Sequence, residues 1–141
     1  MKHDPLAPIA PPRIARWRFD LNTLLAVGVC LPFLFGASMK LLHPHGTANA
    51  FASLGLPLPT LTVWLVILLE LAGSAAAIFG RGRTAAIGAV ALSVFTLAAS
   101  SIAHGFWTFE EPARSEQANI FVEHLSISFA LLWLARVKWH G

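Results

Sequence analysis

The chain has 141 residues, of which 56% are hydrophobic and only 12% are charged, with a formal net charge of +3. Soluble domains carry about a quarter charged residues, so this chain has too few charges to cover a water-exposed surface. The composition argues against a soluble enzyme, a nucleic-acid-binding protein and a disordered chain, and it predicts a membrane protein with no nucleic-acid partner.

The chain begins with a polar arm, residues 1–20, which is rich in proline and arginine. Four apolar segments follow, each of about 20 residues and so long enough as a helix to cross a bilayer. We place them at residues 21–42, 57–79, 84–104 and 117–135. They predict an all-α membrane protein, a bundle of four transmembrane helices with short loops over residues 21–135, followed by a short tail at residues 136–141.

The basic residues are distributed unevenly along this predicted bundle. Eight of the ten fall on one side of the membrane, and the two on the other side are Lys40 and Arg114. The eight are Lys2, Arg13, Arg16, Arg18, Arg81, Arg83, Arg136 and Lys138. Because loops rich in lysine and arginine remain in the cytoplasm, we expect both termini, the arm and the tail to be cytoplasmic.

Recognisable catalytic and metal-binding motifs are absent. Cys30 is the only cysteine, and the sequence contains no phosphate-binding loop, hydrolase nucleophile motif or metalloprotease motif. This favours a protein without independent catalytic activity, although it does not decide the question. His43 and His45 could chelate a metal together with His104, but their spacing fixes no complete ligand set, and we expect no metal.

Small residues recur at intervals of three or four in the first two predicted helices, including Gly28, Gly36 and Gly73. Such residues allow helices in lipid to approach closely, so we expect them at helix contacts. Pro32 should bend the first helix, and a gap at this bend could admit a ligand or water.

Two ionisable side chains are predicted to lie in the middle of the membrane. Counting 1.5 Å per residue from the nearest cytoplasmic arginine puts Glu70 at about 16 Å and His124 at about 18 Å, with Glu123 just above. Lys40 comes out at about 33 Å, near the outer boundary. We therefore reject a direct ion pair between Lys40 and Glu70 unless the first helix is strongly bent, and consider Glu123 more reachable for Lys40.

A charged group at this depth costs at least ~2.5–3.5 kcal/mol, so such groups face the bundle interior and find a partner. Two interpretations remain open. A protonated Glu70 could hydrogen-bond to His124 or to a serine or threonine and hold the helices together. Alternatively, the two residues could form a proton relay, or a polar anchor for a quinone-like or thiol ligand.

Several short motifs occur in an order that is familiar from one family. They are Phe35-Gly36-Ala37-Ser38-Met39-Lys40-Leu41, Gly55-Leu56-Pro57, Glu70-Leu71-Ala72-Gly73, the Gly80-Arg81 turn, and His104-Gly105-Phe106-Trp107-Thr108-Phe109 leading to Asn119. Over about residues 21–135 the chain resembles the DoxX family of small bacterial membrane proteins. The resemblance places Lys40, Glu70, Gly73 and Asn119 at positions of the family pattern.

The resemblance implies a location in the bacterial cytoplasmic (inner) membrane and a link to redox chemistry. Family members are associated with a thiosulfate:quinone oxidoreductase and with an assembly that contains superoxide dismutase and a sulfurtransferase. It therefore implies other membrane-bound or membrane-associated redox proteins as partners besides the lipid bilayer, and it leaves a homo-oligomer open. No cofactor is established by it, and a quinone is the candidate.

We therefore expect an integral accessory subunit of a quinone- or sulfur-linked redox complex. One alternative is a transporter of protons or a small solute. A second is a small quinone- or thiol-linked membrane oxidoreductase with its chemistry at the level of Glu70, His124 and Cys30. The candidate ligand-binding or polar cluster comprises Lys40, Glu70, Asn119, Glu123 and His124.

Overall fold

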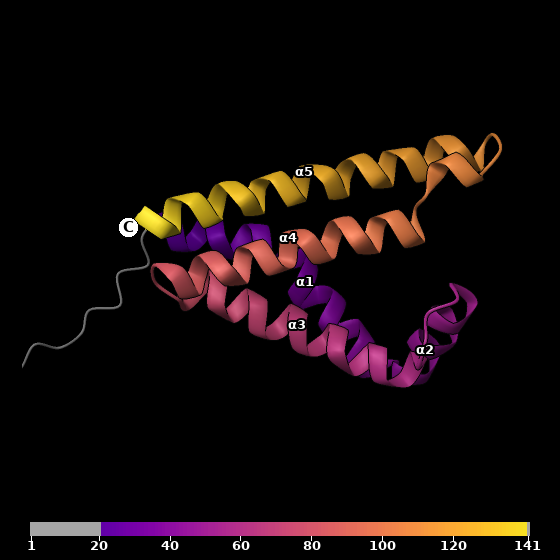
Figure 1. The fold of residues 1–141 in the computed structure, drawn as a ribbon, viewed down its shortest axis with the longest axis horizontal. Coiled ribbons are helices and arrows are strands. Elements are labelled where there is room, and N and C mark those ends of the chain that lie inside the picture. Colours follow the sequence, from indigo (N-terminus) through magenta and orange to yellow (C-terminus); the bar gives the residue numbers. More distant parts are fainter. Residues whose placement is uncertain (1–20, 141) are drawn as a thin grey trace, which may run out of the picture.

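The computed structural model describes residues 21–140, which form five α-helices and one short 3-10 helix (Figure 1). They are α1 (Leu21–Leu42), α2 (Pro44–Ser53), α3 (Pro59–Phe79), α4 (Arg83–Ala103), η1 (Phe106–Thr108) and α5 (Ala113–His140). No strand occurs among residues 21–140, and four of the helices are long and apolar enough to cross a membrane. The predicted all-α membrane protein with four spanning helices is confirmed. The predicted arm at residues 1–20 lies outside the described residues.

The last helix differs most from its expected span. It runs from Ala113 to His140, whereas the apolar pattern suggested residues 117–135, and so residues expected to form a tail are helical. Apolar character marks only the part of a helix that lies in lipid, and a helix can continue into the headgroup layer. Basic side chains such as Lys138 in the last turn of α5 favour this continuation because they complement the negative end of the helix dipole.

The segment between the first two spans was expected to be a loop, and this expectation was wrong. It contains α2, which begins at Pro44 and packs mainly on α3. Proline is well suited to the first position of a helix, where its missing N–H is not needed. This helix was not predicted because it is only ten residues long and has no buried residue.

The helices are arranged so that the basic residues gather at one end of the bundle. Figure 1 shows the start of α1, the end of α5 and the α3–α4 turn together at one end, with α2 and the α4–α5 connection at the other. Two contacts tie the basic end together. Lys138 Nζ donates to the carbonyl of Ile78 at 3.3 Å, and the Arg83 guanidinium lies 5.6 Å from the centre of the Trp139 ring. We call this end, which the sequence predicts to be cytoplasmic, the inner half, and the opposite end the outer half.

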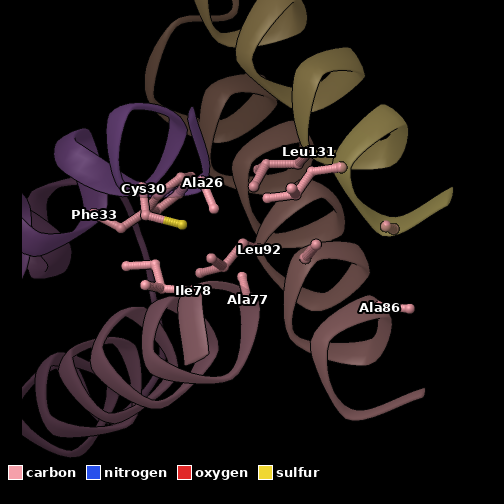
Figure 2. Close-up of a cluster of buried hydrophobic side chains, with 11 residues drawn as sticks. Ala26, Cys30, Phe33, Ala77, Ile78, Ala86, Leu92 and Leu131 are labelled. Carbon is pink, nitrogen blue, oxygen red and sulfur yellow. The ribbon is translucent and has the colours of Figure 1, made fainter. Parts of the chain in front are cut away.

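The hydrophobic core lies in the inner half (Figure 2). Cys30 and Phe33 of α1 face Ile78 of α3, while Leu92 of α4 and Leu131 of α5 close the cluster. The thiol of Cys30 is fully buried there. All four spanning helices contribute to this core, which therefore closes the inner half of the bundle.

Close approach of α3 and α4 depends on two glycines. A Cβ atom on Gly88 would lie 2.8 Å from the Gly73 carbonyl oxygen and 2.7 Å from Cβ of Ala76, and one on Gly73 would lie 2.9 Å from Leu92. The expected packing role of Gly73 is confirmed. Gly28, in contrast, has no such neighbour within 4 Å, so it takes no part in helix contacts.

Candidate functional site

The outer half contains a cavity of about 410 Å³ that all five α-helices help to line. Its walls are mostly apolar and include Pro32, at the predicted bend of α1. The polar side chains on its wall come from different helices and comprise Lys40, Thr62, Glu70, Thr96 and His124. The cavity therefore brings together the three predicted site residues Lys40, Glu70 and His124.

Lys40 and Glu70 form an ion pair at the wall of this cavity. Lys40 Nζ lies 2.9 Å from Oε1 and 3.0 Å from Oε2 of Glu70, and the two side chains are only 19% and 6% exposed. The direct pair that we had rejected, unless the first helix was strongly bent, is therefore formed. The pair links α1 to α3 and satisfies both oxygens of a carboxylate that would otherwise be buried without a partner.

The separation of Lys40 and Glu70 was overestimated because the height of each residue in the membrane was counted from a different charged helix end. Cys30 and Ile78 share the core cluster. From that level Lys40 lies ten residues along α1, about 15 Å, and Glu70 lies eight residues back along α3, about 12 Å. Side chains also tilt toward the N-terminus of their helix. Because α1 and α3 are antiparallel, the Lys40 side chain leans inward and the Glu70 side chain leans outward, toward each other.

Gly36 provides the space that the ion pair occupies. A Cβ atom at this position would lie 3.1 Å from Lys40 Nζ and 3.4 Å from Glu70 Oε1. The glycine stands one helical turn before Lys40, so both lie on the same face of α1. The predicted role of Gly36 in packing is therefore more specific than helix contact alone.

His124 enters the cavity from α5 with one ring nitrogen already engaged. Its Nδ1 lies 2.7 Å from the carbonyl oxygen of Ile120, and since a carbonyl only accepts, Nδ1 carries the hydrogen. The ring stacks on His104 with centroids 5.3 Å apart, and His104 Nδ1 lies 2.8 Å from Gln117 Oε1. Nε2 is therefore the ring nitrogen of His124 that is left for a further partner, and it accepts when the ring carries a single hydrogen.

Glu70 and His124 share the cavity, but they do not hydrogen-bond to each other within the described part of the chain. The carboxylate is bound by Lys40 and the imidazole by Ile120. Thr96, the threonine of α4 on the cavity wall, does not bind Glu70 either, because its hydroxyl donates to the carbonyl of its own helix at Leu92. The helix-bridging hydrogen bond that we had considered for Glu70 is replaced by the ion pair.

The remaining predicted residues lie elsewhere. Glu123 and Asn119 are exposed on α5 and do not line the cavity, so the contact considered between Lys40 and Glu123 is not made. Cys30 belongs to the core below. His43 and His45 are exposed, and residues 21–140 contain no group of three metal-binding side chains.

His104 and Thr96 were missed as members of the site. Their position beside His124 and the cavity depends on the register between α4 and α5. Two serine residues hydrogen-bond across these helices. Ser93 Oγ donates to the carbonyl of Ser128 at 3.0 Å, and Ser128 Oγ donates back to that of Ser93 at 3.4 Å. Serines are frequent in membrane helices, so this pairing gave no recognisable signal in the sequence.

A family model, DoxX, matches residues 22–105. The chain belongs to the DoxX family. The matched region contains Lys40, Glu70 and the α3–α4 glycines, whereas the resemblance had been expected to extend to about residue 135. In this DoxX-family protein, the histidine side of the cavity contributed by α5 lies beyond the matched residues. No curated protein and no solved structure matched the chain.

Membership and the four apolar helices together establish a multi-pass membrane protein. The surroundings of these helices are therefore a lipid bilayer. Whatever occupies the outer cavity must reach it from lipid or from the outer interface, because the inner half is closed by the core described above.

Proposed function

We propose that this DoxX-family protein is an integral subunit of a redox complex of the bacterial cytoplasmic membrane, and that its outer cavity holds a lipophilic carbonyl compound of the quinone class. The observation that carries the proposal is the cavity itself. Its walls are apolar, and an ammonium group and an imidazole lie on different helices around it.

The residues present suit such a molecule in size and in chemistry. A volume of about 410 Å³ falls within the range of small-molecule sites, which are mostly apolar with a few polar groups that orient the ligand. The Lys40 ammonium has three N–H groups, and its bonds to the two oxygens of Glu70 leave one for a carbonyl oxygen. His124 Nε2 can accept from a hydroxyl. A bound quinone would supply a membrane-soluble carrier of two electrons.

The oxidoreductase alternative receives less support. The chain's only thiol, Cys30, is sealed in the core and does not line the cavity. Thiol chemistry with a molecule in the cavity would need a thiol from another protein. If the chain is a subunit of a redox complex, another subunit can exchange electrons with the bound molecule.

Transport of protons or a small solute also receives less support. A pathway would have to continue from the cavity to the cytoplasmic end, and Leu92 and Leu131 are fully buried across that route with Ile78 beside them. Under the transport alternative, Glu70→Gln should abolish flux in proteoliposomes. Flux that depends on this carboxylate would contradict our assignment.

Binding is tested with the full-length protein in lipid nanodiscs and the reduced, quinol form of a short-tailed ubiquinone analogue, whose hydroxyl group can donate to His124 Nε2. We expect His124→Leu to weaken binding by about tenfold, the effect of losing one hydrogen bond from an apolar site. The matched control is Glu123→Gln, because Glu123 is the exposed neighbour of His124 on α5 and its substitution should leave affinity unchanged. Equal affinity in all three proteins would refute a cavity-bound quinone.

The subunit role is tested separately by purification from native membranes under gentle detergent. We expect redox proteins to co-purify in fixed proportion. Recovery of only a monomer or homo-oligomer would refute the subunit role, whatever the outcome of the binding experiment.

A further inference from the structure

A second pocket lies in the inner half of the bundle, at the end opposite the outer cavity, on the lipid-facing surface of α4 and α5. It is a shallow, open groove of about 440 Å³, and none of its lining residues belongs to the outer cavity. Nothing in the proposed redox role uses it. Its position in the inner half places it at the depth of the cytoplasmic leaflet of the membrane.

The floor of the groove is made of alanines. Ala86 and Ala91 of α4 and Ala135 of α5 line it, and two of them, Ala86 and Ala135, belong to the buried core. Small side chains on two closely packed helices leave a trough between the larger residues on either side. The trough is apolar and faces lipid, so it suits an acyl chain rather than a water-soluble molecule.

The cytoplasmic mouth of the groove is basic and aromatic. Arg136, Trp139 and His140 line it, and Arg83 is held 5.6 Å from the centre of the Trp139 ring. Neither arginine has a carboxylate partner among residues 21–140. In that part of the chain, no aspartate or glutamate lies in the last two turns of α5, the first two turns of α4 or the α3–α4 turn.

An apolar trough that ends in unpaired arginines and a tryptophan matches the chemistry of one class of molecule. Basic pockets between membrane helices on the cytoplasmic side bind anionic lipid headgroups, and tryptophan is favoured at that depth. We infer that this groove binds an anionic phospholipid of the cytoplasmic leaflet. An acyl chain lies along the alanine floor, and the phosphate is held by Arg136 and Arg83.

The inference is tested with full-length protein in detergent micelles, titrated with spin-labelled phosphatidylglycerol and with spin-labelled phosphatidylcholine of the same chain length. We expect the protein to prefer phosphatidylglycerol. Arg136→Gln should reduce this preference about fivefold, the contribution of one basic residue near a lipid headgroup. Ala91→Leu should reduce binding of phosphatidylglycerol while all charges remain, because it fills the trough.

The matched control is Arg81→Gln, which removes the same charge from the same end of the bundle at a residue that does not line the groove. It should leave the preference unchanged. An equal loss in Arg81→Gln and Arg136→Gln would show general attraction to a basic surface and would overturn the site. Displacement of the lipid by millimolar inorganic phosphate would overturn it too, because binding would then depend on the phosphate group alone and not on the acyl chain.

Arg136 is exposed and Ala91 is half-buried, so the Arg136→Gln and Ala91→Leu variants should both fold. Size-exclusion chromatography checks this.

Discussion

The two halves of the bundle are built from the same four spanning helices, yet they pack in opposite ways. In the inner half, Gly73 and Gly88 bring α3 and α4 into backbone contact, and a fully apolar core joins all four. In the outer half the helices surround a cavity, and the ion pair between Lys40 and Glu70 joins α1 to α3 beside it. Dense packing holds one half together, and a charge pair contributes to holding the other.

This difference explains why costly charges persist in the membrane. Where small residues meet, dispersion contacts suffice to join helices in lipid. Where a cavity is kept open, those contacts are lost, and a directional interaction can join the walls without filling the space. The ion pair of Lys40 and Glu70 therefore has a structural role in addition to presenting an ammonium group to the cavity.

The largest effect is expected from breaking the ion pair from one side. Lys40→Met should lower the free energy of unfolding by about 3–5 kcal/mol, because it leaves the buried Glu70 carboxylate without its partner. Chemical unfolding in mixed micelles measures this change. The double variant Lys40→Met with Glu70→Gln should recover most of the loss, since no charge then remains buried. A double variant as unstable as the single one would contradict the assigned role.

An intermediate effect is expected in the inner half. Gly88→Ala should cost about 1–3 kcal/mol, because the added methyl group meets the backbone of α3, which cannot move without separating the helices. Gly28→Ala is the matched control, as its Cβ meets nothing; it should leave stability unchanged or slightly raised. If the two variants unfold at the same denaturant concentration, the close contact of α3 and α4 is not what stabilises this half.

The smallest effect is expected for the same substitution in the outer half. Gly36→Ala should cost less than about 1 kcal/mol, because the nearest atom is the end of the flexible Lys40 side chain, which can shift. Comparing its unfolding free energy with that of Gly88→Ala measures the contrast between the halves directly. A cost for Gly36→Ala above that for Gly88→Ala would reverse the comparison.

The fold could be predicted because lipid imposes simple rules. Runs of about 20 apolar residues mark spanning helices, and the uneven arginines orient them. Helix α2 does not follow these rules because it is only ten residues long and buries no residue, so hydropathy does not distinguish it from a loop. These rules also did not predict that α5 extends beyond residue 135, because polar residues mark the edge of the lipid and not the end of a helix.

Of the five residues predicted for the site, three line the cavity, and Asn119 and Glu123 do not. Lys40, Glu70 and His124 were selected because ionisable residues in a membrane need a partner, and all three line the cavity. The choice of pairing partner depends on the register between helices. Counting from the charged residues at the helix ends gives this register only approximately. The tilt of side chains toward the N-terminus of each helix brings the Lys40 ammonium and the Glu70 carboxylate closer than the counted backbone heights indicated.

The ion pair also constrains how the protein is assembled during synthesis. Its two members are 30 residues apart, so Lys40 leaves the ribosome and enters the membrane with α1 before the carboxylate of α3 exists. A lysine near the outer end of α1 can wait there with its ammonium group in the headgroup layer. Only when α3 follows does the charge acquire its counter-ion, so α1 is joined to this neighbour after its own insertion and before α5 is made.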